Sequence, residues 1–380
     1  MIVEVDEGRY DRQERIWWWD QKRLLHSRVL VVGAGALGNE IVKNLALVGV
    51  GRIDVVDMDD IENSNLARCV FFTIADQGRP KAVALAEAAS RLNPDVAITP
   101  YVRPIQTLGS GALIDYDLVI AGLDNREARL WLNSACRRLG KYWVDGAIEG
   151  LQGLARVFGP DGACYECTLS EADLAQLGHR RSCALLSPED LAMGRTPTNA
   201  TTASVVAGLE VQEAIKLLVG RPELLALNGR VWRLEGETMM TSTIEYVENE
   251  WCMAHDRIDW GGASVDVSEL PQRVTSLAAG DEGRGEIVAI DMPDDLIRID
   301  ACASCGAGDV ILGLRPTLPL GAGRCSECQS DRPMTSRTSL EPDHPWLGDE
   351  WASIRWPDCE IVGVRFTNET IYEIVRNEAP

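Results

Sequence analysis

Short apolar runs alternate with amphipathic segments over the greater part of the chain. Residues 29–32 and 53–56 are brief and β-branched, as strands buried in a parallel sheet are, and the segment between them carries Ile41, Leu45 and Val48 on one helical face. Further strands are predicted at 97–101, 118–121, 142–145, 152–158, 231–235 and 241–247, and further helices at 81–92, 126–139 and 203–219. This alternation predicts a doubly wound, Rossmann-like α/β domain with a mostly parallel sheet.

The pattern changes twice towards the C-terminus. Residues 170–202 are polar and lack a period, and a strong helical pattern follows them, so we interpret them as a crossover loop. Residues 259–269 are rich in Gly, Ser and Asp and are typical of a linker. The sequence therefore predicts one domain at 1–258 and a second, small β domain at 270–380, whose last strands are joined by a turn that contains Asn368.

The N-terminal segment, residues 1–27, is predicted to form a helical arm. Apolar and aromatic residues recur at helical spacing, and Trp17, Trp18 and Trp19 would circle such a helix. A helix that is apolar on all sides should be buried, so we expect the arm to pack at a subunit interface. Packing in a core or a dimer is a commoner use of such tryptophans than ligand stacking.

Three glycines, Gly33, Gly35 and Gly38, follow the first predicted strand in GxGxxG spacing. Such glycines let the backbone turn tightly and approach a phosphate, whose charge is met by the N-terminus of the next helix. Asp57 ends the second strand, 19 residues after Gly38, where a carboxylate accepts hydrogen bonds from ribose hydroxyls. A ligand-free contact between helix and strand would explain the glycines alone, but the ordered set of features indicates a nucleotide site.

Polar residues beyond Asp57 indicate which nucleotide is bound. Asp59, Asn65 and Arg68 lie in the run DMDDIENSNLAR, and Lys81 follows in GRPKA. A nicotinamide dehydrogenase needs little beyond the ribose acid here, whereas a triphosphate needs amides and cations. Arginine binds phosphoryl oxygens as a fork and lysine binds them as a point charge. Each residue alone is more often a solvated surface charge, but the cluster favours a nucleoside triphosphate.

Asp124 follows the predicted strand 118–121, in the segment GLDN. Open α/β sheets place ligands at the carboxyl ends of their strands, and a carboxylate there can hold a Mg²⁺ ion that bridges phosphates. Taken by itself, Asp124 is equally well explained as the N-cap of the next helix. The phosphate-binding cluster upstream favours magnesium, and Asn125 joins the candidates for nucleotide binding.

Seven of the 11 cysteines fall, with His255, into four short pairs. The pairs are Cys164 with Cys167, Cys252 with His255, Cys302 with Cys305, and Cys325 with Cys328. The last two pairs form CxxC-x19-CxxC, which is within zinc-ribbon spacing. In a chain without an export signal, such pairs more often bind zinc than form disulfides. Four ligands leave no position for water, so we predict two structural zinc sites.

Charge and composition narrow the class of protein. The formal net charge of −21 disfavours nucleic acid as the main partner, because phosphate binding needs a large basic surface. The N-terminus lacks the apolar stretch of a signal peptide, and no run of 18 apolar residues is present to span a membrane. We therefore expect a cytoplasmic protein in a reducing compartment, with no membrane and no nucleic acid as partner.

From Arg9 to His255 the chain resembles the ThiF-type enzymes that activate ubiquitin-like proteins and the sulfur carriers of molybdopterin and thiamine synthesis. The motifs that carry the resemblance are RYDRQ, GAGALG, DMDDIENSNLAR, GRPKA, RLNPDVAITP, AGLDNREAR, CYEC and TASVVAGLEVQEAIKLL. Two positions depart from the usual pattern, because Ala36 replaces a glycine and Cys69 replaces a glutamine. Neither departure removes a charge that the chemistry needs.

The resemblance implies ATP and Mg²⁺ as ligands of the predicted site. It assigns the ribose to Asp57, the phosphates to Asn65, Arg68 and Lys81, and the metal ion to Asp124. Arg12 would reach the phosphates of a partner subunit, and a homodimer is implied because one chain carries a single adenylation domain. The family has a cysteine where His255 stands, so this residue is the variable zinc ligand.

Cys183 is the single cysteine of the crossover loop, and the cations of Arg180 and Arg181 beside it would lower the pKa of its thiol. In the family, a cysteine of this loop takes the modifier as a thioester. We interpret Cys183 as the nucleophile, with an ordinary loop cysteine as the alternative. The implied reaction is adenylation of the C-terminal glycine of a ubiquitin-like protein, thioester formation on Cys183, and transfer to a conjugating enzyme.

Three other functions stay open. A sulfur-carrier adenylyltransferase would stop at the adenylate and pass the carrier to a sulfur donor. A binding protein without catalysis is disfavoured by the retained Asp57, Arg68, Lys81 and Asp124, and a nicotinamide oxidoreductase is disfavoured by the phosphate-binding cluster. By analogy with ubiquitin-type activators, the C-terminal domain captures the conjugating enzyme, and a purely stabilising zinc domain is the alternative.

Overall fold

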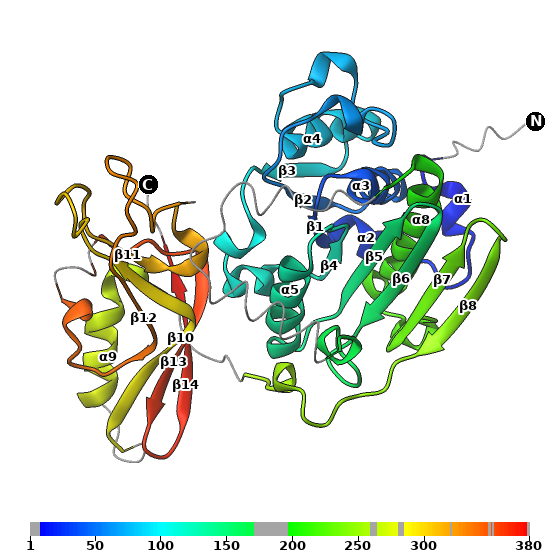
Figure 1. Ribbon diagram of the computed structural model, residues 1–380. Helices are drawn as coiled ribbons and strands as arrows, with labels where there is room; N and C mark the ends of the chain where they lie inside the picture. The colour runs from blue at the N-terminus through cyan, green and yellow to red at the C-terminus, as the bar shows by residue number, and fades with distance from the viewer. Residues whose placement is uncertain are drawn as a thin grey trace, which may run out of the picture. The chain divides into compact units, whose positions relative to one another are not determined.

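The computed structural model (Figure 1) describes residues 8–170, 197–258, 264–279, 285–319, 321–348, 351 and 353–377. The chain divides into two compact units. In the described part, the first unit comprises residues 8–105, 115–168 and 197–256, and the second comprises 106–114, 169–170 and the described residues beyond 256. Among the described helices, none is both long and apolar enough to cross a membrane.

The first unit is built on an eight-stranded sheet in the order β3-β2-β1-β4-β5-β6-β7-β8. Its strands are β1 (Arg28–Val32), β2 (Arg52–Val56), β3 (Ala97–Tyr101), β4 (Leu118–Ala121), β5 (Trp143–Glu149), β6 (Gln152–Phe158), β7 (Arg230–Glu235) and β8 (Met240–Glu245). Strands β1 to β5 pair in parallel, and β5 to β8 form an antiparallel extension. The chain moves outward from β1 to β3 and then returns to the other side of β1 at β4. This reversal between β1 and β4 is where a doubly wound sheet opens a ligand crevice.

Four long helices accompany this sheet: α3 (Ala36–Val48), α4 (Lys81–Leu92), α5 (Arg126–Arg138) and α8 (Ala200–Leu218). Helix α3 packs against α4 and α8, and α8 also contacts β4, β5 and β6. Crossovers between parallel strands are right-handed. From β1 to β3 the strands are added on one side of β1, and from β4 to β5 they are added on the other side, so α5 lies on the opposite face of the sheet from α3 and α4. Strand β4 is buried at every position, as its uninterrupted apolar sequence predicts. The predicted doubly wound α/β fold is confirmed.

The predicted N-terminal helix is wrong in its extent. The chain forms two short helices, α1 (Asp11–Glu14) and α2 (Gln21–His26), and the three tryptophans lie between them. Asp20 caps α2 by accepting a hydrogen bond from the backbone N–H of Arg23 at 3.1 Å, which starts a new helix after the tryptophans. Trp17 is 78% exposed, while Trp18 and Trp19 pack against the core of the first unit.

The second unit is organised around a six-stranded sheet in the order β11-β10-β13-β14-β9, with β12 paired to β10. Its elements are β9 (Ser264–Asp266), α9 (Leu270–Ala279), β10 (Ile287–Ile299), β11 (Ile311–Leu314), β12 (Met334–Leu340), β13 (Cys359–Phe366) and β14 (Thr370–Arg376). Its core contains three buried tryptophans, and Trp351 donates its indole N–H to the carbonyl of Val267 at 2.8 Å. Strands β13 and β14 form the predicted hairpin across the turn that holds Asn368.

Two segments correct the predicted domain boundaries. Ser264–Asp266, expected within a linker, forms β9 and pairs in parallel with β14, so that part of 259–269 belongs to the second sheet. Residues 106–114 also join the second unit, where the backbone N–H of Ser110 lies 3.1 Å from the carboxylate of Glu360. Glu360 is buried, and this loop supplies the donors that its charge requires. The second unit is therefore discontinuous in sequence.

Candidate functional site

The three glycines after β1 serve two different purposes. Gly33 has a φ of +100°, and a Cβ there would lie 2.5 Å from the carbonyl oxygen of Gly122. A Cβ on Gly38 would lie 1.8 Å from the carbonyl oxygen of Gly33, so both glycines are required by the packing of the protein itself. A Cβ on Gly35 would meet no described atom within 4 Å. Gly35 therefore leaves the space over the loop open, as the predicted phosphate site requires.

Asn39, which was not among the predicted site residues, holds the glycine loop in place. Its fully buried amide nitrogen donates to the carbonyl oxygens of Ala34 at 2.8 Å and Gly35 at 3.0 Å. Its amide oxygen accepts from the backbone N–H of Phe71 at 3.1 Å. One side chain thus joins the glycine loop to the segment beyond β2. The available signal was a polar residue within the first turn of a helix that directly follows the glycine loop.

Asp57 lies at the carboxyl end of β2, as predicted. One carboxylate oxygen accepts from the backbone N–H of Ala34 at 2.6 Å, and the other accepts from that of Asp59 at 2.8 Å. Burial raises the pKa of Asp57, while the charge of Lys81 and these two hydrogen bonds oppose the rise. Each oxygen has a second lone pair, so the carboxylate retains the capacity to accept from ribose hydroxyls.

Lys81 is the first residue of α4, and the acidic residues of the predicted site surround its ammonium group. Its Nζ lies 2.7 Å from a carboxylate oxygen of Asp59, and its side chain is mostly buried. Burial is the largest influence and disfavours the charged form, but the carboxylates of Asp57, Asp59 and Asp124 outweigh it and raise the pKa of Lys81. The lysine therefore stays cationic, beside a carboxylate from the end of β4.

Asp124 itself is exposed, in the loop between β4 and α5. The N-cap of α5 is Asn125, whose side-chain oxygen accepts from the backbone N–H of Ala128 at 2.7 Å. The alternative that Asp124 caps the helix is therefore wrong. Asn125, predicted to bind nucleotide, uses its side-chain oxygen for the cap, and the hard carboxylate oxygens of Asp124 fit a divalent cation.

Arg68 and Asn65 lie in the segment between β2 and α4. Asn65 is buried, and its side-chain oxygen accepts from the backbone N–H of Glu62 at 2.8 Å, so it shapes the loop. Arg68 donates to the carbonyl of Ser64 at 3.1 Å. The charges of Arg68 and Lys81 lower the pKa of the neighbouring Cys69 thiol and that of Asp57 raises it, against the larger rise that burial causes.

Arg12 does not join this cluster in its own chain. It is exposed on α1, and the next residue, Gln13, donates to the carbonyl of Val48 at 2.9 Å. Val48 ends α3, whose other end carries the glycine loop roughly 20 Å away at the rise of an α-helix. A contribution of Arg12 to a phosphate site in a partner subunit stays a prediction.

The first predicted zinc cluster is present in the first unit. The ligand atoms of Cys164, Cys167, Cys252 and His255 lie within 4.8 Å of one another. The Nε2 atom of His255 lies 3.2 Å from the sulfur of Cys167, and its Nδ1 atom lies 3.3 Å from a carboxylate oxygen of Glu248. A carboxylate behind the imidazole is the usual support of a zinc-bound histidine. The donor set fits a closed, tetrahedral zinc site with His255 as the fourth ligand.

The second cluster is built from two turns of the same design in the second unit. The sulfur atoms of Cys302, Cys305, Cys325 and Cys328 lie within 4.8 Å of one another. The backbone N–H groups of Gly306 and Gln329 donate to the carbonyls of Cys302 at 2.8 Å and Cys325 at 3.0 Å. Gly306 and Gln329 both have a positive φ, which is uncommon for a glutamine. Two matched turns that each present two thiols fit one structural zinc ion.

Cys183, the predicted nucleophile, lies outside the described residues. Two other unpaired cysteines of the first unit are described, and burial is the main cause that raises the pKa of Cys69 to about 11 and that of Cys136 to about 12. Both side chains are buried, so neither supplies a thiolate at neutral pH.

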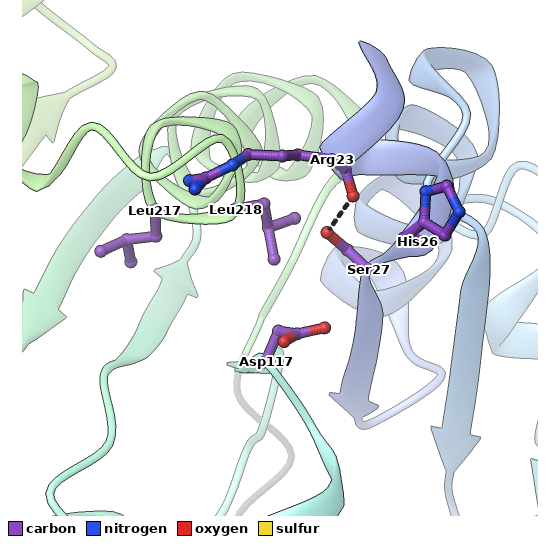
Figure 2. Close-up of a pocket in the computed structure, with 6 residues that line it drawn as sticks. All are labelled: Arg23, His26, Ser27, Asp117, Leu217 and Leu218. Carbon is purple, nitrogen blue, oxygen red and sulfur yellow. Dashed lines mark hydrogen bonds between the residues drawn. The ribbon is translucent and has the colours of Figure 1, made fainter. Parts of the chain in front are cut away.

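A hollow of about 380 Å³ lies elsewhere on the first unit (Figure 2). Its lining residues are Arg23, His26, Ser27, Asp117, Leu217 and Leu218. Ser27 and Asp117 immediately precede β1 and β4, so the hollow lies at the amino ends of the parallel strands. The predicted nucleotide residues lie at the carboxyl ends, and the hollow is therefore a separate feature of the opposite edge.

Residues 10–253 match the ThiF family. The SAMP-activating enzyme E1 of Haloferax volcanii is 36% identical over 265 residues, which are 66% of this chain and 91% of that protein. The sulfur carrier protein adenylyltransferase of Thermus thermophilus is 38% identical over 215 residues, 54% of this chain and 74% of that protein.

Two further likenesses are more limited. The NEDD8-activating enzyme E1 catalytic subunit of Schizosaccharomyces pombe is 40% identical over 154 residues, which are 39% of this chain and 35% of that protein. The crystal structure of Escherichia coli MccB with ATP matches at a TM-score of 0.55 and 21% identity, over 67% of this chain and 75% of that one. At that identity the structural likeness shows the fold.

Proposed function

The chain belongs to the ThiF family of adenylyltransferases, and from this premise we propose that it activates the C-terminal glycine of a ubiquitin-like protein with ATP. The observation that carries the proposal is the convergence of Asp57, Lys81 and Asp124 beside the open space over Gly35. Relatives named as activators of SAMP and NEDD8 support the same class of substrate.

In the first step, an oxygen of the substrate carboxylate attacks the α-phosphorus of ATP, a P–O bond breaks, and pyrophosphate leaves. Lys81 and Arg68 supply fixed positive charge to the phosphates, and charge held in place before the reaction costs no reorganisation. Asp57 accepts from the ribose hydroxyls and orients the nucleotide. Asp124 would hold Mg²⁺, which when bound neutralises phosphate charge.

In the second step we propose that the Cys183 thiolate attacks the carbonyl carbon of the adenylate, so that a thioester forms and AMP leaves. The buried Cys69 and Cys136 support this choice, because their raised pKa values leave them as thiols. The cations of Arg180 and Arg181, next to Cys183 in sequence, favour its thiolate. A conjugating enzyme's cysteine then accepts the modifier.

The proposal also includes bound zinc and a dimer. The two ligand clusters hold two structural Zn²⁺ ions, one in each unit. The chain acts as a homodimer in the cytoplasm, and Arg12 of each subunit reaches the phosphates bound by the other. The distance of Arg12 from the glycine loop of its own chain supports this exchange.

The test is exchange of labelled pyrophosphate into ATP by the purified full chain, with Mg²⁺ and a ubiquitin-like protein of the same organism that ends in glycine. Exchange should require all components, and the same protein without its last glycine is the control. Absence of exchange with every such protein overturns the proposal.

A second candidate is a sulfur-carrier adenylyltransferase, which the relative from Thermus thermophilus favours by name. Both functions share the adenylate, so exchange does not separate them. A thiol-sensitive conjugate of the full chain with the ubiquitin-like protein, lost in Cys183→Ala while exchange continues, supports the thioester route. Exchange without any such conjugate supports the sulfur-carrier route.

A further inference from the structure

A buried ionic network lies between β5 and α5, and the reaction as proposed above does not use it. The carboxylate of Asp145 on β5 is 0% exposed and receives two guanidinium groups. Arg129, 6% exposed, donates from Nε to one carboxylate oxygen at 2.8 Å. Arg156, 8% exposed, donates from Nε to the other at 2.7 Å. Burying three charges is costly unless each is paired, so the network calls for an explanation.

The two arginines differ in their other hydrogen-bond partners. Arg129 also donates from Nη2 to the carbonyl oxygen of Leu123 at 2.6 Å and to that of Gly146 at 3.0 Å. Leu123 is the residue before Asp124. Arg156 donates from Nη1 to the hydroxyl of Tyr246 at 3.4 Å.

The loop that carries Asp124 is thus fixed at successive residues. The backbone N–H of Gly122 donates to the carbonyl of Val32 on β1 at 2.9 Å. Arg129 holds the carbonyl of Leu123, and Asn125 is held by its cap on α5. The side chain of Asp124 is left exposed on a backbone that is tied on both sides. Such support is typical of residues that must present a carboxylate at a set position.

We propose that Arg129 is a positioning residue, which ties the Asp124 loop to β5 so that the carboxylate is presented to the divalent cation that accompanies ATP. The inference rests on the proposed function, because it takes Asp124 as the metal-binding carboxylate. Asp145 forms an ion pair with Arg129 and so fixes its guanidinium group. Arg156 forms a second ion pair with Asp145, and the hydrogen bonds of its side chain go to Asp145 and Tyr246, neither of which is in the loop.

The test compares Arg129→Gln with Arg156→Gln in the full chain. Each variant removes one guanidinium from the same buried carboxylate, so both should lower the melting temperature by similar amounts. Only Arg129→Gln also releases the Leu123 carbonyl. We measure Mn²⁺ affinity by isothermal titration in the presence of a non-hydrolysable ATP analogue, which reports the site without turnover.

Arg129→Gln should weaken Mn²⁺ binding roughly ten-fold or more, as loss of a supporting contact does at other metal sites, while Arg156→Gln stays within about two-fold of the parent. Arg129→Lys, which keeps a cation that can reach one of the two acceptors, should give an intermediate affinity, and it replaces the glutamine variant if that variant does not fold. Equal Mn²⁺ affinities in the Arg129 and Arg156 variants overturn the inference.

Asp124→Asn separates this failure from that of the proposed function. If Asp124→Asn binds Mn²⁺ as tightly as the parent, Asp124 is not the metal-binding carboxylate, and both the metal assignment and the inference fall. If Asp124→Asn loses Mn²⁺ while Arg129→Gln keeps it, the metal assignment stands and the positioning role is overturned.

Discussion

The predicted nucleotide site and the second cysteine cluster are assembled in opposite ways. In the nucleotide site, charges converge from segments far apart in sequence: Asp57 ends β2, Lys81 opens α4, and Asp124 follows β4. In the cluster, two short turns of the same design each supply two thiols, and each turn holds itself by backbone hydrogen bonds. The fold has to be complete before the first site exists, whereas the halves of the second form locally.

This difference in assembly predicts that activity and stability can be changed separately. In the proposed function, residues of the predicted nucleotide site act on a ligand, so their loss should reduce the reaction and change the fold little. In the same proposal, the cysteines of the cluster hold a structural zinc ion, whose binding free energy would contribute to the folding of the second unit. Variants in the two regions test this separation.

Cys325→Ser should remove the zinc of the second cluster and unfold part of the second unit, since structural zinc contributes an apparent binding free energy of about 10 kcal/mol at neutral pH. Bound zinc should fall from two ions to one per chain, measured by elemental analysis and calorimetry. Ser326→Ala, in the same turn but outside the ligand set, is the matched control. Pyrophosphate exchange that falls together with the zinc content would contradict the separation.

Lys81→Met should slow pyrophosphate exchange by roughly 100- to 1,000-fold, because it removes a fixed charge from the phosphates. The melting temperature should change little, since the lysine is held among carboxylates at the edge of the unit and not in its apolar core. Lys43→Met removes a lysine paired with Glu40 on α3 and should leave exchange unaltered. An unaltered exchange rate in Lys81→Met would remove the lysine from the mechanism.

Gly35→Ala should raise the KM for ATP roughly ten-fold with little loss of stability, because its Cβ would meet no atom of the described residues and would fill the space over the loop. Gly38→Ala is the contrasting variant. Its Cβ would clash with the carbonyl of Gly33, so we expect a loss of about 3 kcal/mol of stability from overpacking. Steady-state kinetics and thermal melts measure the KM for ATP and the stability of both variants. Equal changes in both quantities would show that Gly35 does not serve the ligand and Gly38 the packing.

Glu210→Gln should have the smallest effect, and that effect should depend on pH. Glu210 on α8 is fully buried, and no described atom makes a hydrogen bond to its carboxylate. Burial raises its pKa well above the ordinary 4.5; Asp145 adds to the rise, and Arg129 and Arg156 oppose it.

A carboxyl group with a raised pKa in the folded state costs stability as the pH rises above 4.5, because the unfolded chain ionises first. Glutamine does not titrate. The melting temperature of the variant minus that of the parent should therefore increase by roughly 2–4 °C between pH 5 and pH 8. A constant difference across that range would show that Glu210 does not titrate differently in the folded state.

Much of the fold followed from local pattern. The strands at 97–101 and 152–158 and the helix at 81–92 were predicted to the residue, because a buried strand and an amphipathic helix each impose their own period on the chain. The N-terminal helix failed because one capping residue, Asp20, starts a new helix where the apolar period continues. The linker failed because composition does not reveal that Ser264–Asp266 pairs with a strand from the end of the chain.

The sequence by itself determined the chemistry that is available: the glycine loop, the acid at the end of β2, the cations that follow it, and two sets of zinc ligands. These signals are short-range, since spacing along the chain sets spacing in the turn or strand. Only the tertiary structure decided which polar residues support them, as Asn39 does for the glycine loop and Arg129 does for Leu123. Hydrogen bonds between distant segments leave no period in the sequence, and they are set only when the strands and helices pack.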